Sequence, residues 1–297
     1  GKLKMSKIEH IKLKNGLNIY YYANSSFNLS TCIVEVGAGS FMEDRGVNNG
    51  WSHFLEHMMF KNSKHWNTRD RLNKMSENAV DWNAFTGSEE IYFYFNCPNI
   101  YYEEVFDIYL DMLFNPSFDE DELKVERNVV IAEMKQQNSR DSYKCMRAFS
   151  EYGFGKEARK TFFSNSTIGL LKDLKKCNSE SLRDWYEKYF DPRNLTIIMT
   201  GPPRNYEKLV KKIEALDLKP NKFNIVSKVK ERIKIANNFR VTAGYELMHV
   251  DGRNSSFIFL WKNALPIKHM KEIPLLINVL VAYKEYLGGG PNSVLWN

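Results

Sequence analysis

Alternating apolar and polar residues predict an antiparallel hairpin near the start of the chain. Residues 8–14 and 17–23 alternate in this way on either side of Asn15-Gly16. Two such runs around Asn-Gly are the strongest short sequence signal for a hairpin. A third alternating run, residues 29–36, ends at Gly37-Ala38-Gly39-Ser40 and predicts a further strand.

Two helices are expected between residues 49 and 78, and from Tyr101 onward the hydrophobic period becomes helical. Thr68, Asn99 and Asp119 are capping residue types at the start of such runs, and the acidic residues after Asp119 suit the dipole of a helix. Helices are predicted at residues 49–60, 68–78, 99–114, 168–175, 180–189 and 206–216, with a longer one from 119 through 133. Strands are predicted at residues 83–97, which hold four consecutive aromatic residues, and 194–200.

A change of pattern at Lys219-Pro220-Asn221 predicts a domain boundary. We expect residues 1–218 to form one α+β domain with antiparallel strands. In residues 219–239 lysines alternate with apolar residues, and we interpret this segment as a linker, solvated or in a strand. Residues 240–297 return to strands followed by a helix, and they predict the start of a second domain.

Charge and composition narrow the class of function. The net charge of +6 is spread along the chain, and without blocks of like charge or a nucleic-acid motif we expect no nucleic-acid partner. No segment approaches the roughly 20 apolar residues of a membrane span, so we expect no membrane partner. The four cysteines contain no Cys-x-x-Cys pair, which favours reduced thiols in the cytoplasm or an organelle matrix.

The segment His53-Phe54-Leu55-Glu56-His57 is the centre of the functional interpretation. Residues three and four apart share one face of a helix, with Cβ atoms roughly 5–6 Å apart. His53 and His57 can therefore reach one metal ion, and Glu56 lies on the same side. Catalytic zinc usually takes three protein ligands and leaves its fourth position to water, so a third ligand must come from another element.

Glu126 and Glu133 are the candidates for that third ligand. They lie seven residues apart on the helix that begins at Asp119, so about two turns place them on one face. Either carboxylate can bind the metal while the other orients a ligand. Zinc lowers the pKa of its bound water to about 7, and Glu56 can accept the proton of that water. The combination predicts a peptide-bond hydrolase.

Several blocks in order resemble the inverzincin metallopeptidases, which include pitrilysin, insulin-degrading enzyme and the mitochondrial processing peptidases. Besides the inverted zinc motif, the matching blocks are Val36-Gly37-Ala38-Gly39-Ser40, Met58-Met59-Phe60-Lys61, Asn83-Ala84-Phe85-Thr86, residues 126–133, residues 166–170 and residues 194–201. The resemblance is close over residues 8–201 and looser beyond.

The resemblance implies a fold of two similar α+β units, each an antiparallel sheet backed by helices, the second incomplete in this chain. The family spacing selects Glu133 as the third zinc ligand and leaves Glu126 to hydrogen-bond a zinc-binding histidine. Asn83, Ala84, Phe85 and Thr86 correspond to the sheet edge where family members add a peptide substrate as a strand.

The resemblance also implies a partner. Family members complete the site with an arginine and a tyrosine from the C-terminal half, which this sequence does not reach. We therefore expect a homo- or heterodimer partner, or a missing C-terminal half, to supply them.

Two functions follow from the resemblance. The first is a zinc-dependent endopeptidase acting on unfolded peptides or leader segments. The alternative is a non-catalytic peptide-binding or scaffold subunit of a peptidase heterodimer. Such homologues typically lose one of the four site residues, and all four are present here.

Overall fold

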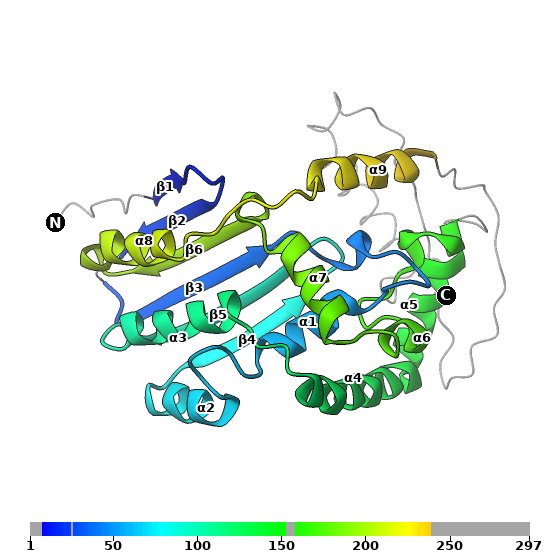
Figure 1. The fold of residues 1–297 in the computed structure, drawn as a ribbon, viewed down its shortest axis with the longest axis horizontal. Helices are drawn as coiled ribbons and strands as arrows, with labels where there is room; N and C mark the ends of the chain where they lie inside the picture. Colours follow the sequence, from blue (N-terminus) through cyan, green and yellow to red (C-terminus); the bar gives the residue numbers. More distant parts are fainter. Residues whose placement is uncertain (1–7, 25, 153–157, 239–297) are drawn as a thin grey trace, which may run out of the picture. The chain divides into compact units, whose positions relative to one another are not determined.

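A six-stranded sheet organises the described part of the chain, residues 8–24, 26–152 and 158–238 of a computed structural model. Its strands are β1 (Ile8–Lys12), β2 (Asn18–Ala23), β3 (Leu29–Val36), β4 (Asp81–Thr86), β5 (Ile91–Pro98) and β6 (Leu195–Gly201). They lie in the order β1-β2-β6-β3-β5-β4 (Figure 1). Among the described residues, β4 is therefore an edge strand, and β6 is inserted between two strands from the start of the chain.

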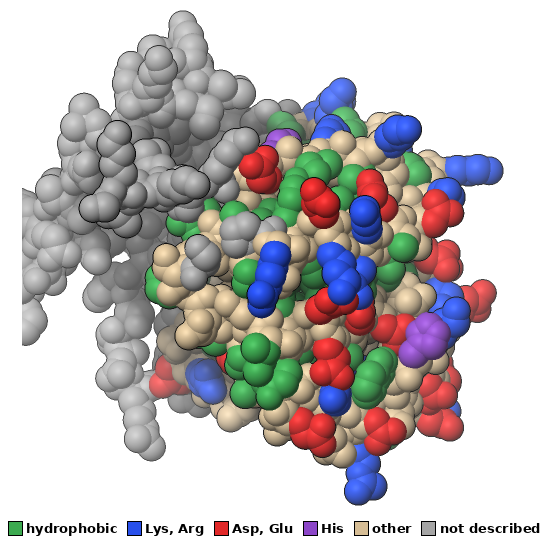
Figure 2. Space-filling view, turned by 90° about the vertical axis from the view of Figure 1, so that its left-hand side faces the viewer, with side chains coloured by type: hydrophobic (Ala, Val, Ile, Leu, Met, Phe, Trp, Pro, Cys, Tyr) green, Lys and Arg blue, Asp and Glu red, His purple; other side chains and the backbone are tan. Residues whose placement is uncertain are grey.

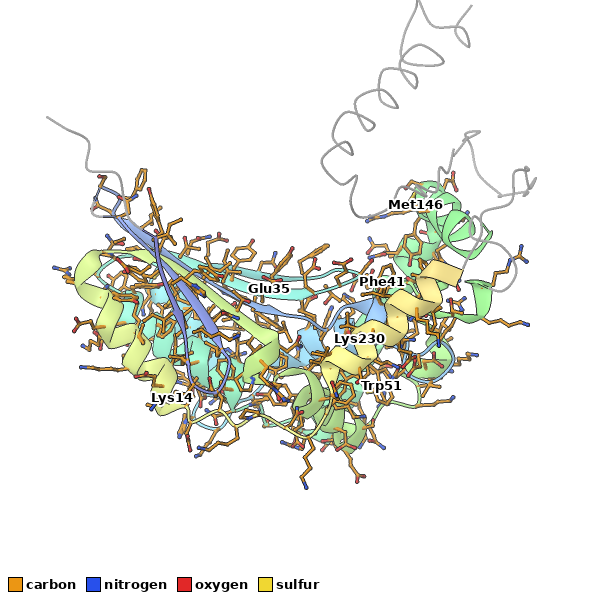
Figure 3. The ribbon with its side chains drawn as sticks, turned by 90° about the horizontal axis from the view of Figure 1, so that it is seen from above. Lys14, Glu35, Phe41, Trp51, Met146 and Lys230 are labelled. Atoms are coloured by element: carbon orange, nitrogen blue, oxygen red, sulfur yellow. The ribbon has the colours of Figure 1, made fainter. Side chains whose placement is uncertain are left out.

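Helices lie on one face of this sheet and beyond one end of it (Figure 1). They are α1 (Trp51–Met59), α2 (Thr68–Glu77), α3 (Tyr102–Phe114), α4 (Glu120–Ser139), α5 (Asp141–Tyr152), α6 (Leu171–Leu174), α7 (Ser179–Tyr189), α8 (Tyr206–Ala215) and α9 (Ile225–Asn238), with a 3-10 turn η1 at Ser40–Met42. Helix α1 contacts β4 and β5, α3 contacts β5, and α8 contacts β2. Seen from above, α8 lies below the strands, whereas α5, which carries the labelled Met146, lies beyond the end of the sheet (Figure 3).

Burial alternates along the central strands. From Ser30 to Val36, every second residue of β3 is fully buried on the helix side. The residues between them, which include Glu35, are partly exposed on the other face (Figure 3). This period of two matches the alternation in the sequence, and the predicted strand at residues 29–36 has the bounds of β3.

The predicted hairpin around Asn15-Gly16 is confirmed. Strands β1 and β2 pair antiparallel, and the N–H of Leu13 donates to the carbonyl of Leu17 at 2.8 Å. Gly16 has φ +99°, a conformation that glycine adopts without steric cost. The Asn-Gly pair therefore sets the register of the first two strands.

The α+β class is confirmed, but the sheet is mixed rather than wholly antiparallel. Strands β2 and β6 pair in parallel, while the other four neighbouring pairs are antiparallel. A parallel pair needs a long crossover connection. Here that connection holds β3, β4, β5 and the helices α1 to α7, and sequence periodicity does not reveal that β6 returns beside β2.

The single strand predicted at residues 83–97 is wrong, since this segment is a hairpin of β4 and β5. The N–H of Gly87 donates to the carbonyl of Glu90 at 2.8 Å and closes the turn. Thr86 then pairs with Ile91 across the hairpin. The predicted strand contains the polar residues Gly87 to Glu90 before its aromatic run, and glycine and serine are typical turn residues.

Two predicted helix caps are also wrong. Asn67, not Thr68, caps α2, because its side chain accepts from the N–H of Asp70. Asn99 does not cap α3, which begins after Tyr101, and its side chain bonds instead to Ser30 and Phe27. Asp119 caps α4 as predicted, accepting from the N–H groups of residues 121 and 122.

An aromatic core joins β5 to α3. The buried ring of Phe95 lies 5.7 Å from that of Tyr102 and 4.8 Å from that of Tyr109, measured between centroids. Full burial of a large apolar side chain contributes about 1.5–3 kcal/mol.

Ion pairs join α8 to α3 at the surface, where lysines of α8 pair with acidic residues of α3. Charges of both signs mix on the face shown in Figure 2.

Two helices were not predicted, α5 and α9. Helix α9 lies in the segment 219–239, which we interpreted as a solvated linker or a strand. Its Arg232 is only 8% exposed, because it packs against the loop after β3. The expected second domain, residues 240–297, lies outside the described residues, so the domain boundaries remain predictions.

Candidate metal centre

Helix α1 presents its histidines on one side and its apolar residues on the other. Phe54, Leu55 and Met58 are 0–2% exposed and anchor the helix in the core. His53 and His57, four residues apart, face away from that core with ring centroids 4.7 Å apart. The apolar and metal-binding residue types of the motif therefore occupy separate faces of a short helix.

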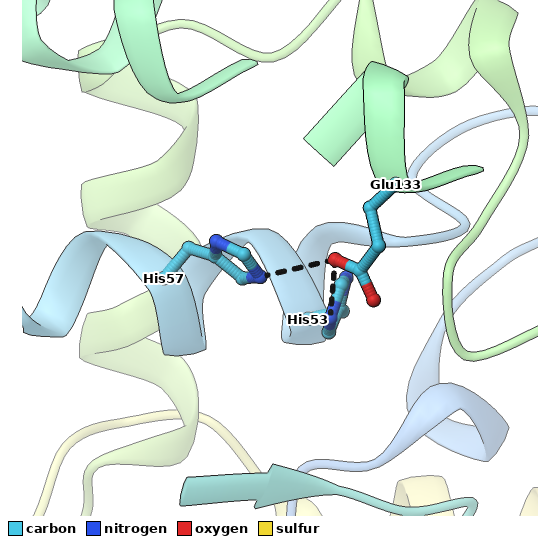
Figure 4. Close-up of side chains that lie close together, drawn as sticks. All are labelled: His53, His57 and Glu133. Atoms are coloured by element: carbon cyan, nitrogen blue, oxygen red, sulfur yellow. Dashed lines mark ion pairs between the residues drawn. The ribbon is translucent and has the colours of Figure 1, made fainter. Parts of the chain in front are cut away.

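Glu133 of α4 lies opposite the two histidines. Its Oε2 atom is 3.7 Å from Nε2 of His53 and 3.5 Å from Nε2 of His57 (Figure 4). One ligand atom from each of the three residues lies within 4.8 Å of the others, and no other group of this kind occurs within the described ranges. The sequence expectation that these three side chains meet agrees with this geometry.

The donor set fits zinc. Tetrahedral ligands at about 2.0–2.2 Å from zinc lie roughly 3.3–3.6 Å from one another. The two distances from Glu133 are close to this range before any metal draws the side chains together. Two imidazoles and one carboxylate are also a ligand set of catalytic zinc, which keeps a fourth position open.

Glu126 sits behind the metal-facing side of His57. Its Oε1 atom is 2.7 Å from Nδ1 of His57, and its Oε2 atom is 2.5 Å from Nζ of Lys61. The expected hydrogen bond between Glu126 and a histidine is therefore present. A carboxylate on Nδ1 fixes the tautomer and leaves Nε2 for a metal.

Burial and neighbouring charges shift the pKa values of the two histidines in opposite directions. Burial, with the neighbouring His57, lowers the pKa of His53 to about 3, so this imidazole is neutral and able to bind a metal. Burial opposes a charge on His57, but the hydrogen bond and charge of Glu126, with the charges of Glu56 and Glu133, raise its pKa. Nδ1 of His53 is buried without a hydrogen-bond partner in the described part of the chain.

Glu56 is held by the hydroxyl of Thr86, which donates to its Oε2 atom. Burial and the nearby charge of Glu133 raise the pKa of Glu56. A carboxylate with a raised pKa is a better proton acceptor near neutral pH. Glu56 thus lies between the candidate metal ligands and the edge strand β4.

The four residues predicted to bind substrate divide between two faces of β4. Asn83 and Phe85 are exposed, whereas Thr86 is 6% exposed and points to Glu56. Ala84 is partly buried, and its N–H donates to the side chain of Asn83 at 2.9 Å. A peptide strand pairing with Ala84 would have to displace that side chain.

Sequence reasoning missed three contributions to the centre. Lys61 pairs with Glu126, Gln137 donates to Oε1 of Glu133 at 3.1 Å, and the hydroxyl of Thr86 donates to Glu56. Lys61 lies beyond the end of α1, so helical spacing gave no signal for it. Gln137 lies four residues after Glu133 on α4, and this spacing was a signal for their contact.

The chain contains a domain of the insulinase family. Residues 19–161 match the family model described as Insulinase (Peptidase family M16). They hold both histidines, Glu56, Glu126 and Glu133. We conclude that this region is a peptidase family M16 domain.

Curated relatives agree with this assignment. An uncharacterized zinc protease of Bacillus subtilis, YmxG, is 29% identical over 194 residues, which cover 65% of this chain and 46% of that protein. An insulin-degrading enzyme homolog of Dictyostelium discoideum is 24% identical, over 66% and 20% respectively. A probable mitochondrial-processing peptidase subunit beta of Arabidopsis thaliana is 25% identical, over 69% and 37%. The aligned part of this chain spans less than half the length of each.

Solved structures share the fold. A protease from Helicobacter pylori superposes with a TM-score of 0.67 at 19% identity, covering 74% of this chain and 52% of that one. The first half of the periplasmic protease PqqL from Escherichia coli has a TM-score of 0.64 at 22% identity, covering 73% and 47%. The expected α+β fold is therefore the M16 fold. None of the helices within the described residues is both long and apolar enough to cross a bilayer.

Proposed function

We propose that this chain is the metal-bearing part of a zinc-dependent endopeptidase. The observation that carries the proposal is the meeting of His53, His57 and Glu133, with Glu126 on the far nitrogen of His57. Zinc supplies, when bound there, a water of lowered pKa and a Lewis acid for the scissile carbonyl.

The remaining chemistry belongs to Glu56. Thr86 occupies its Oε2 atom, so Oε1 is the atom that we assign to the proton of the attacking water. Glu56 then passes this proton to the leaving amine, as a general base that becomes a general acid. Its burial, which raises its pKa, suits both steps.

The substrate that we propose is an unfolded peptide or a leader segment. Edge strand β4 lies beside the helix that carries Glu56 and can accept a peptide as an added strand. Pairing through the main chain gives affinity without strong sequence preference. The strand residues that we assign to substrate binding are Asn83, Ala84, Phe85 and Thr86. The side chain of Thr86 contributes through its hydrogen bond to Glu56.

A second candidate function is a peptide-binding or scaffold subunit without catalysis. Some relatives are named as subunits of the mitochondrial processing peptidase. Both proposed functions include a second homologous unit, which lies either in a partner chain or in a longer form of this chain.

The compartment that we propose is a reducing one, the cytoplasm or an organelle matrix. The buried free thiols of Cys32, Cys97 and Cys177 support it.

The test is metal content together with peptidase activity. The purified protein is expected to hold about one zinc per chain, and to cleave members of a quenched fluorescent peptide panel when its partner unit is supplied. A chelator should abolish cleavage and added zinc should restore it. Protein that neither contains nor binds zinc refutes both the site and the function. Zinc binding without cleavage of any peptide favours the scaffold.

A further inference from the structure

Helix α1 begins without a capping side chain from its own N-cap residue. Gly50 occupies that position with φ +103°, and it has no side chain to accept the first N–H groups. Unsatisfied N–H groups at a buried helix start are costly. Another part of the chain must therefore accept them, and His53 lies only three residues further on.

Glu43, seven residues before Gly50, performs this task. Its Oε2 atom accepts from the N–H of Gly50 at 2.7 Å, and its Oε1 atom accepts from the N–H of Ser52 at 2.8 Å. The side chain of Asn49 donates to the same Oε2 at 2.7 Å. Glu43 is fully buried, and an acidic group at this end also complements the helix dipole.

The loop that carries Glu43 is itself held from α9. Arg232 donates from Nη2 to the carbonyl of Met42 at 3.2 Å, to that of Glu43 at 3.1 Å and to Oδ1 of Asp44 at 2.6 Å. Its guanidinium also stacks over the ring of Phe162, 4.7 Å from the centroid. These contacts fix the main chain at the residue that caps α1.

We propose that Glu43 is a positioning residue for the zinc ligand His53, and that Arg232 of α9 holds Glu43 in place. The contacts form a continuous path from α9, through the carbonyl and then the carboxylate of Glu43, to the first turn of α1. The zinc part of this inference rests on the proposed function, whereas the part concerning the start of α1 does not.

A role in overall stability alone predicts something different. It would lower the unfolding temperature but leave the first turn of α1, and zinc affinity, unchanged in the folded protein. A positioning role loosens that turn and weakens zinc binding while the protein remains folded. Hydrogen exchange at residues 50–56 and the zinc dissociation constant distinguish the two roles.

The experiment uses the full chain with Glu43→Gln, Arg232→Met and a control, Lys228→Met. Lysine 228 lies on the same helix as Arg232 and pairs with the same Asp44, at 3.2 Å, but makes no bond to Glu43. Glutamine keeps the shape of Glu43 but turns one acceptor into a donor facing N–H groups. Exchange is measured on metal-free protein and zinc affinity by chelator competition, both well below the unfolding temperature.

In Glu43→Gln we expect exchange at residues 50–56 to become about tenfold faster, the usual size of a lost helix cap. Zinc affinity should fall about tenfold or more, as for other groups that orient a ligand. Arg232→Met should shift both readouts the same way, each about threefold, and Lys228→Met should change neither. Arg232→Met keeps the test decisive if the Glu43 variant does not fold.

Unchanged exchange and unchanged zinc affinity in both variants would overturn the inference, even if the unfolding temperature falls. A Lys228→Met effect as large as that of Arg232→Met would overturn the link to α9. Failure of the wild-type chain to bind zinc would instead refute the proposed function. The exchange measurement, which needs no metal, still decides whether Glu43 fixes the start of α1.

Discussion

The two ring nitrogens of His57 face different carboxylates. Nδ1 lies 2.7 Å from Oε1 of Glu126, and Nε2 lies 3.5 Å from Oε2 of Glu133. These carboxylates come from one face of α4, two turns apart, yet only Glu133 also approaches His53. The arrangement gives two glutamates of one helix different expected tasks, one as a ligand and one as a partner of a ligand.

Zinc affinity should separate these two glutamates. Glu133→Gln is expected to remove most of the affinity, because a neutral amide is a poor zinc ligand. Glu126→Gln should weaken binding less, about 10–100-fold, since it disturbs only the hydrogen bond to His57. Both variants are measured by chelator competition in one buffer. Metal loss in Glu126→Gln with retention in Glu133→Gln would reverse the assignment.

Glu56→Gln should keep zinc and lose turnover. The amide preserves the shape of the side chain and can still accept from Thr86, but it cannot take a proton. A positioned general base typically contributes about 10²–10⁴-fold, and kcat should fall by that factor. Zinc content, measured on the same sample, is the control. Wild-type turnover in this variant would assign the proton to another group.

Asp111 should stabilise the fold in a pH-dependent way. Burial opposes its charge, but bonds from Ser63 Oγ at 2.6 Å and from His65 hold its pKa below the ordinary 3.8. The pKa of Asp111 is lower in the folded protein than in the unfolded chain. Its ionised form therefore stabilises the fold fully at pH values above the unfolded pKa of 3.8. It is lost as pH falls through the folded value.

Asp111→Asn is therefore expected to lower the free energy of unfolding by about 1–3 kcal/mol at neutral pH. The difference from wild type should shrink below roughly pH 4. Asp107 lies on the same helix as Asp111 and makes a more exposed pair with Lys212 of α8. Asp107→Asn should cost less than about 1 kcal/mol. Denaturant unfolding at several pH values measures both. A pH-independent cost for Asp111→Asn would contradict the assignment.

Gly169→Ala should destabilise the protein more than Gly46→Ala. Both glycines have φ +85°, so an alanine is strained at either position. A Cβ at residue 169 would also lie 2.4 Å from the carbonyl oxygen of Asn49 and from Cα of Gly50, whereas at residue 46 it meets only the end of Lys172. Gly46→Ala thus measures mainly the strain of the left-handed backbone, about 1–2 kcal/mol. Equal unfolding temperatures for the two variants would refute the close approach.

The sequence predicted the parts of this structure in which local pattern and tertiary role coincide. Strand β3 and the first hairpin have one face on the core, so alternation alone gave their positions. The proximity of His53 and His57, the candidate metal ligands on α1, followed from helical spacing. The choice of Glu133 over Glu126 did not, because both share a helix face and only packing against α1 separates them.

Other features depend on contacts that no local pattern contains. The sequence of helix α9 has the pattern of an exposed basic segment. Only the structure shows that Arg232 is buried against the carbonyl of Glu43. The parallel pairing of β2 with β6 joins residues nearly 180 positions apart, counted from Asn18 to Thr196. The bond from Thr86 to Glu56 could not be predicted either, because the strand signal gives alternation but not which face meets α1.

The placement of β6 has a consequence for how the protein can be made. Since β6 lies between β2 and β3, a nascent chain or a fragment that stops before Leu195 has no strand to join its first hairpin to the rest. It would hold an isolated two-stranded hairpin, which is marginally stable in water, and an open edge on β3. The residues that match the family model, 19–161, include neither β1 nor β6. A fragment limited to them is therefore expected to be less stable than one that extends through Gly201, because it lacks the strand that joins the two parts of the sheet.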